Sequence, residues 1–168
     1  MEKTGKIMWG IFCCLALAAL TYYFNQKITE KTNPNQYIES IVNSQQTSII
    51  LKQNNQGHYV ASGFINNEPV NFLLDTGATL ISIPLNLANR LNLAKGKSYP
   101  VSTANGKVTV YSTNISSLKI GALGFKNLEG HLNPGMQGNT ILLGMNALKH
   151  LELIQRNNTL TISTPTYD

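Results

Sequence analysis

The sequence predicts an all-β domain, a small closed barrel with two short helices, preceded by one N-terminal transmembrane helix. Residues 7–24 form an apolar run without a charged side chain. From Thr47 onward, short segments of β-type residues alternate with turn signals such as Asn-Gly and Asn-Asn. The alternation of strands and long helices that a parallel α/β domain requires is absent from the sequence.

The apolar run at residues 7–24 has the length of a membrane span. A helix rises about 1.5 Å per residue, so this run spans roughly 27 Å, close to the thickness of the hydrocarbon core. Lys3 and Lys6 precede it, and the aromatic pair Tyr22-Tyr23 stands at its far end. We expect residues 1–6 in the cytoplasm and the C-terminal domain on the other side of the membrane.

A cleaved signal peptide is the main alternative for this segment. The basic start suits a signal peptide, but the run is long and ends in the bulky Thr21-Tyr22-Tyr23-Phe24 instead of a small-residue cleavage site. An uncleaved anchor therefore fits the residues better. A buried core helix fits poorly before a polar segment at the N-terminus.

The remaining elements follow from local patterns. Residues 25–46 read as a polar linker with a short helix around 36–42, residues 47–163 as the folded domain and 164–168 as a tail. One short helix is expected after Pro84, with Leu85, Ala88 and Leu91 on its apolar face, and a second at Met145–Leu151. The expected strands are 47–52, 58–65, 69–74, 80–83, 101–104, 107–112, 117–120, 125–132, 141–144, 153–154 and 159–162.

Composition excludes several classes of function. Charged residues make up 12% of the chain, and 20 asparagines leave much of the surface neutral. The net charge of +5 is spread without a basic stripe, so we expect no nucleic-acid partner. Cys13 and Cys14 both lie in the apolar run, so the polar part of the chain has no disulfide or cysteine-based metal site.

The candidate catalytic residue is Asp75, in the tripeptide Asp75-Thr76-Gly77 that follows the apolar run Phe72-Leu73-Leu74. This order places a carboxylate at the end of a core strand, on a turn where glycine allows tight folding. The only other aspartate in the sequence is the C-terminal Asp168. If Asp75 performs acid–base chemistry with a second carboxylate, we expect that partner to come from another copy of the chain.

Three segments together resemble the retropepsin-like aspartic proteases. They are the signature Leu73–Thr79, the Asn105-Gly106 hairpin within Val101–Val108, and the second motif Ile141–Leu148. The resemblance covers about residues 47–162. More narrowly, Ser102–Gly106, Leu142–Met145 and the N-terminal anchor are similar to the bacterial membrane-anchored branch of that family.

The resemblance implies a membrane-anchored endopeptidase that works as a homodimer on an extended peptide or protein substrate, without metal or cofactor. It also implies a single-pass protein of the bacterial inner membrane with a periplasmic domain. The implied site residues are Asp75 as the catalytic acid, Thr76, Gly77 and Ala78 as loop support, Thr103, Ala104, Asn105 and Gly106 as the substrate-binding flap, and Leu142, Leu143 and Gly144 as the second motif. Many viral relatives carry a further acid after the signature glycine, whereas this sequence has Thr79 and Leu80 there.

Other candidates find less support. His58, His131 and His150 share no metal-ligand spacing, and we interpret them as surface or turn histidines. A serine-hydrolase Gly-x-Ser-x-Gly motif is absent from the sequence. A phosphate-binding loop at Asp75 would need a parallel α/β domain. The alternative function is a non-catalytic dimerising or peptide-binding module of the same fold on the membrane.

Overall fold

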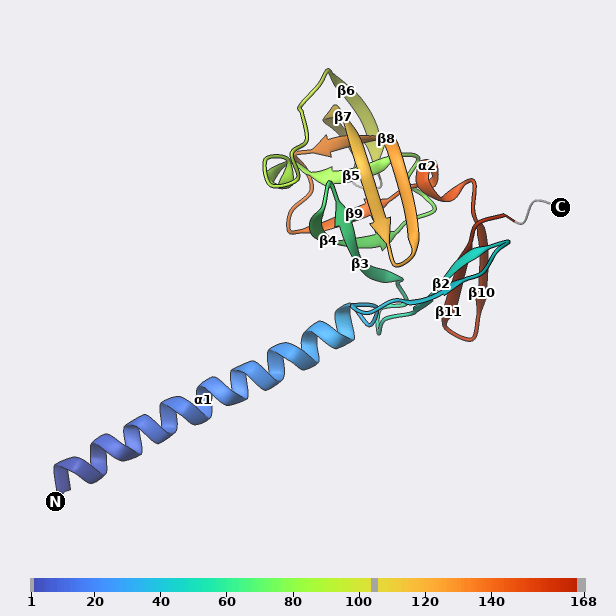
Figure 1. Cartoon of the computed structure of the whole chain (residues 1–168). Coiled ribbons are helices and arrows are strands. Elements are labelled where there is room, and N and C mark those ends of the chain that lie inside the picture. The colour runs from blue at the N-terminus through green and yellow to red at the C-terminus, as the bar shows by residue number, and fades with distance from the viewer. Residues whose placement is uncertain (1, 104–105, 166–168) are drawn as a thin grey trace.

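The computed structural model describes residues 2–103 and 106–165 as a β-barrel joined to one long helix (Figure 1). The elements in chain order are α1 (Glu2–Thr32), β1 (Glu39–Val42), β2 (Thr47–Lys52), β3 (Val60–Ile65), β4 (Glu68–Leu74), β5 (Ile81–Pro84), the 3-10 helix η1 (Leu85–Leu87), β6 (Ser98–Thr103), β7 (Gly106–Ile120), β8 (Leu123–Asn133), β9 (Thr140–Leu143), α2 (Met145–Leu148), β10 (Glu152–Arg156) and β11 (Thr159–Ser163).

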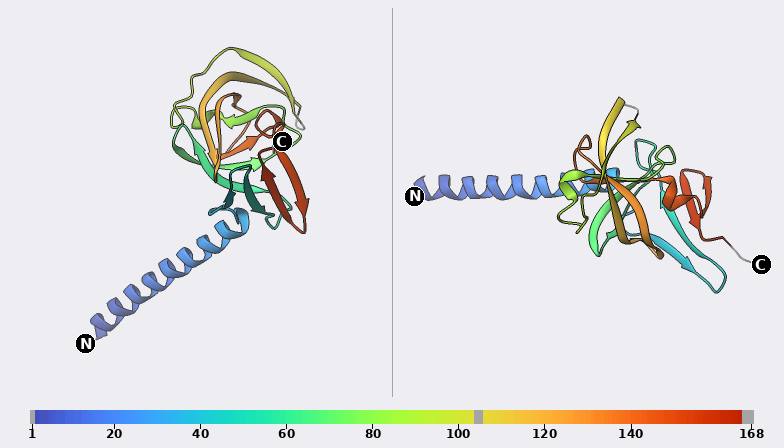
Figure 2. Two further views of the ribbon diagram at one scale, coloured as in Figure 1. Left: turned by 45° about the vertical axis from the view of Figure 1, so that its right-hand side comes forward. Right: turned by 90° about the horizontal axis from the view of Figure 1, so that it is seen from above.

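Seven strands form the barrel, in the order β3-β4-β9-β5-β8-β7-β6. Antiparallel pairing of β3 with β7, with Phe64 opposite Lys119, closes six of these strands into a ring. β6 lies outside the ring and pairs with β7 alone among the described strands. A second sheet, in the order β1-β2-β11-β10, lies beside the barrel (Figure 2). The predicted all-β barrel with two short helices is confirmed.

Two parallel pairs decide where the candidate site forms. β4 runs parallel to β9, with Leu74 opposite Leu143, and β5 runs parallel to β8. Because parallel strands end at the same edge, Asp75 after β4 and Gly144 after β9 emerge side by side. The aliphatic interior beneath that edge holds both turns in place. Its largest fully buried side chains are Phe72, Ile49, Leu51, Ile65, Ile81, Ile83, Leu91, Ile115, Leu118, Leu132, Ile141 and Leu143.

The segment at residues 25–46 differs from the expected polar linker in its local structure. The helix α1 continues to Thr32, and the helix predicted around residues 36–42 is wrong, because Glu39–Val42 is strand β1 paired with β2. The β-branched Ile41 and Val42 suit a strand, and β2 offers them a free edge. Likewise, residues 107–112 and 117–120 belong to one long strand, β7, instead of two.

The helix α1 projects away from the barrel (Figures 1 and 2). It is long and apolar enough to cross a bilayer, and none of its apolar window is buried against the rest of the protein. Its large exposed side chains include Trp9, Phe12 and Leu15. In water such a surface would be unfavourable, so an apolar environment around this part of α1 suits its composition.

Candidate active site

Asp75 occupies the first position after β4, in a turn held by the backbone. Its N–H donates to the carbonyl of Leu143 at 3.1 Å, and its carbonyl accepts from Ala78 N–H at 3.2 Å. The Asp75 Oδ1 accepts a hydrogen bond from Gly77 N–H at 2.9 Å. The carboxylate is half-buried, whereas Thr76 and Gly77 are exposed in the turn. The aspartate is therefore fixed at the surface end of the core strand.

The start of α2 braces the turn from behind. Met145 N–H donates to the carbonyl of Ala78 at 2.7 Å, and Asn146 N–H donates to the carbonyl of Thr79 at 3.0 Å. Gly144 lies where a Cβ atom would stand 2.5 Å from the Leu80 oxygen and 2.8 Å from the Ala78 oxygen. A side chain at Gly144 would push these two backbone segments apart, so glycine is required by the close approach.

Asn146 connects this brace to two further strands. Its Oδ1 accepts from Ile81 N–H at 3.1 Å, and its Nδ2 donates to the carbonyl of Glu129 at 2.7 Å. The sequence pattern placed Asn146 within the second motif but gave it no role. Its partners lie 65 and 17 residues away along the chain, so no local pattern could have shown these contacts.

A cavity of about 850 Å³ opens over Asp75. Thr103, Gly106 and Lys107 line it from the β6–β7 hairpin, and Leu142 lines it from β9. The other lining residues are Gly77, Ala78, Thr79, Leu80, Ser82, Tyr99, Val101, Ser102, Val108, His131, Asn133, Gly135 and Met136. Asp75 is the only carboxylate among these described lining residues.

The predicted site residues therefore fall into three groups. Asp75, Gly77, Ala78, Thr103, Gly106 and Leu142 line the cavity, whereas Thr76 is exposed in the turn. Leu143 and Gly144 are buried behind it. The flap residues Ala104 and Asn105 lie outside the described residues. Within residues 2–103 and 106–165, no group of three His, Cys, Asp or Glu side chains could hold a metal ion.

His131 forms part of one cavity wall, so its interpretation as a surface or turn histidine is wrong. It lies on β8, where Ser82 of β5 is its register partner, and its Nε2 is 2.8 Å from Ser82 Oγ. Ser82 Oγ in turn donates to Met136 Sδ at 3.1 Å. The buried Nδ1 has no hydrogen-bond partner among the described residues.

Two pKa values in this wall are shifted by burial. Burial lowers the pKa of His131, because the surrounding atoms disfavour the charged ring. The ring of Tyr99, from β6, meets the His131 ring edge-on at a centroid distance of 6.4 Å. Burial, followed by the nearby Glu129 carboxylate, raises the pKa of the Tyr99 hydroxyl. At neutral pH the His131 and Tyr99 rings in this wall are therefore both uncharged.

A family model described as "gag-polyprotein putative aspartyl protease" matches residues 61–150, more than half of the chain. The chain belongs to the retropepsin-like aspartic protease family. The match includes the Asp75 turn, the β6–β7 hairpin and the β9–α2 brace. It thus covers every element that surrounds the candidate cavity.

The chain also resembles solved structures, of which the first named here supports this family. A retropepsin-like aspartic protease from Rickettsia conorii superposes with a TM-score of 0.59 at 25% identity, covering 76% of this chain and 94% of that chain. EIAV protease complexed with the inhibitor HBY-793 gives a TM-score of 0.47 at 24% identity, covering 59% of this chain and 92% of that chain.

Two curated relatives of this retropepsin-like chain are uncharacterized proteins. One, from Rickettsia prowazekii, is 31% identical over 107 residues, which cover 62% of this chain. The other, from Sinorhizobium sp and named for the cobV 5' region, is 23% identical over 163 residues, covering 92% of this chain and 70% of its own length. The chain spans only 46% of the length of the Rickettsia prowazekii relative.

Proposed function

We propose that this retropepsin-like chain is an aspartic endopeptidase that cleaves peptide bonds with two Asp75 carboxylates, one from each copy of a homodimer. One observation carries the proposal. A single half-buried carboxylate lies on a braced turn at the base of an open cavity, and no second carboxylate lines that cavity among the described residues. One copy therefore offers half of an acid–base pair.

The chemistry follows from placing two carboxylates close together. Like charges a few ångströms apart resist double ionisation, so the pair shares one proton and titrates as a unit. The ionised member accepts a proton from a bound water, which attacks the carbonyl carbon of the scissile amide. The protonated member donates to the developing oxyanion. Neither step needs a metal or an organic cofactor.

The neighbouring residues have supporting roles in this proposal. Gly77 N–H already donates to Asp75 Oδ1, which fixes the orientation of the carboxylate. Thr76 is exposed, as a residue must be to brace the equivalent turn of a second copy. Thr103 to Gly106, in the β6–β7 hairpin, would cover an extended peptide and exclude water, while Ala78 and Leu142–Gly144 support the base of the cavity.

We further propose that residues 7–24 anchor the protease domain, residues 47–163, in a bacterial inner membrane with the domain in the periplasm. The length and apolar composition of α1 support the anchor. Confinement to a membrane raises the local concentration of chains, which favours a weak dimer.

The test is cleavage of a peptide library by the full chain in detergent micelles, compared with Asp75→Asn. We expect the substitution to lower cleavage by at least about 10²-fold, because it removes the general acid–base pair. The Asn Oδ1 can still accept from Gly77 N–H, so the melting temperature should stay within a few degrees. Undiminished cleavage by a folded Asp75→Asn protein would refute this mechanism, and absence of cleavage by both proteins would favour the non-catalytic module.

A further inference from the structure

The end of α1 is joined to the barrel by buried polar contacts. Asn33 is 4% exposed, and its Nδ2 donates to Ser62 Oγ at 2.9 Å and to Asn71 Oδ1 at 3.0 Å. Asn35 is 2% exposed, and its Nδ2 donates to the carbonyl of Val60 at 2.7 Å. Buried amides with these partners are costly to separate. The helix is thus fixed to the domain instead of being tethered by a loose linker.

This joint sets the distance and orientation of the domain relative to the proposed membrane. Eight helical residues, 25–32, separate the apolar run from Asn33. At about 1.5 Å per residue they place Asn33 roughly 12 Å beyond the hydrocarbon edge, a few ångströms outside the headgroup layer of about 5–8 Å. Along the axis of α1 in Figure 1, β4 and the coil after β5 extend little beyond the end of the helix. β6 and the β10–β11 hairpin extend much farther in that direction.

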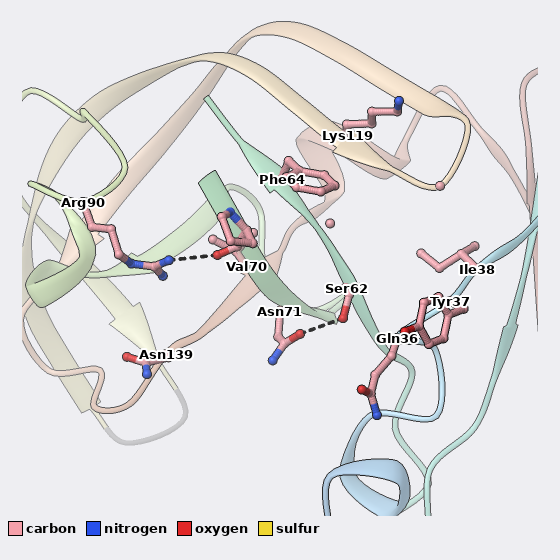
Figure 3. A pocket seen from close by; sticks show the side chains of 13 residues that line it. Gln36, Tyr37, Ile38, Ser62, Phe64, Val70, Asn71, Arg90, Lys119 and Asn139 are labelled. Atoms are coloured by element: carbon pink, nitrogen blue, oxygen red, sulfur yellow. Dashed lines mark hydrogen bonds between the residues drawn. The ribbon is translucent and has the colours of Figure 1, made fainter. Parts of the chain in front are cut away.

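A groove of about 690 Å³ opens on this membrane-proximal face. Arg90 stands on one side and Lys119 on the other, with Phe64 beside Lys119, whereas Tyr37 lies at another edge next to Ile38 (Figure 3). Tyr37 is 97% exposed and Phe64 is 47% exposed. The full lining is Gln36, Tyr37, Ile38, Ser62, Gly63, Phe64, Pro69, Val70, Asn71, Arg90, Lys119, Gly121 and Asn139. These described lining residues include two cations and no acid.

Arg90 is held at the rim by a hydrogen bond from its Nη1 to the carbonyl of Pro69 at 2.9 Å. A guanidinium has five N–H donors, so the others remain available for an anion. Arginine, lysine and exposed aromatic rings are the side chains that contact phosphate headgroups and the membrane interface. Charge and position therefore favour the same occupant.

We propose that this groove binds the phosphate headgroups of anionic phospholipids in the membrane that α1 spans. The proposal rests on the membrane anchoring proposed above. The long side chains of Arg90 and Lys119 reach the phosphates, and Tyr37 and Phe64 face the outer edge of the headgroup layer. Docking holds every copy at the same distance from the membrane and at the same tilt. The Asp75 cavity of each copy then has the same orientation relative to the membrane surface. Two copies then meet by diffusing within a plane.

The experiment uses the full chain with Trp9→Phe and Tyr37→Trp, so that the single indole reports on the groove. The chain is reconstituted in vesicles of phosphatidylcholine, with or without 30% phosphatidylglycerol, that contain a headgroup-attached nitroxide quencher. We expect stronger quenching in the anionic vesicles. Arg90→Gln with Lys119→Gln should lower the docked-to-undocked ratio by roughly 30-fold, from about fivefold for each cation.

Matched controls separate specific docking from general charge. Lys97→Gln with Lys149→Gln removes the same charge from exposed sites outside the groove and should leave quenching unchanged. Arg90→Lys keeps the charge and should retain most of the quenching in anionic vesicles. Equal quenching in the two vesicle types would overturn headgroup binding. So would a loss of quenching in the Lys97→Gln, Lys149→Gln control as large as in the groove variant.

Carbonate washing of the same vesicles distinguishes the two proposals. A chain that stays in washed vesicles but shows no preference for anionic lipid retains the anchor and contradicts the docking. A chain that washes out contradicts both. A chain that stays and is quenched in a manner dependent on Arg90 and Lys119 supports both.

Discussion

The Asp75 turn and the β6–β7 hairpin face the same cavity, yet they are held in different ways. The turn is joined to β9 and α2 by backbone hydrogen bonds, including Met145 N–H to the Ala78 carbonyl at 2.7 Å. β6 lies outside the closed ring and pairs with β7 alone in the part of the chain that the structure describes. Four of its six residues are exposed, the other two are partly buried, and none is fully buried.

The two segments have different tasks, because the turn holds the acid in place before the reaction and the hairpin covers the substrate. The acid must be held in one position for proton transfer, and its contacts lie in the densely packed part of the barrel. The hairpin must admit a peptide and then cover it, so few fixed contacts suit it. We therefore expect substitutions at the base to change the free energy of unfolding together with activity. Substitutions in the hairpin should change activity with little effect on stability.

A pair of glycine substitutions gives the largest contrast. Gly144→Ala places a Cβ against the carbonyls of Leu80 and Ala78, and should lower the free energy of unfolding by about 3 kcal/mol. Gly106 has φ of +106° but no described atom within 4 Å of its Cβ position. Gly106→Ala should cost only about 1–2 kcal/mol, from backbone strain alone. Urea denaturation measures both, and a larger loss for Gly106→Ala would break the comparison.

Asn146→Ala should have the next largest effect. It removes the acceptor of Ile81 N–H and the donor to the Glu129 carbonyl, which leaves two backbone groups unpaired. We expect a loss of about 1–3 kcal/mol in urea denaturation, together with reduced kcat. The control is Asn114→Ala, at an exposed position on β7, which should change neither quantity. Equal behaviour of the two variants would show that the brace has no special role.

His131 gives the smallest effect, visible as a pH dependence of stability. Because folding lowers its pKa, the folded protein binds fewer protons than the unfolded chain just below the ordinary value of about 6.5. The contribution of neutral His131 to folding stability is therefore present above that pH and is lost as pH falls toward the lowered pKa. His131→Phe keeps an aromatic ring beside Tyr99 and should flatten the melting-temperature profile between pH 5 and 7.5. An unchanged profile would exclude His131 as its source.

The sequence predicted the elements whose signals are local. The apolar run before Asp75, the Asn-Gly turn and the uncharged N-terminal run each lie within a few neighbouring residues. The β1 strand was missed because it is only four residues long and depends on pairing with β2, which a local pattern does not show. Asn146, His131 and the buried joint at Asn33 were missed because their partners are distant along the chain. Parallel register brings His131 to Ser82, and tertiary packing places Asn33 and Asn146 beside their partners, neither of which a single sequence displays.

The most direct test of paired Asp75 carboxylates is a subunit-mixing titration. Wild-type chain and Asp75→Asn chain are mixed in detergent and co-reconstituted, and peptide cleavage is measured at constant wild-type amount. With random pairing and saturated dimers, a fourfold excess of Asp75→Asn should lower cleavage to about one fifth, by mass action. Cleavage that stays unchanged at every ratio, with mixed dimers confirmed by crosslinking, would contradict the account.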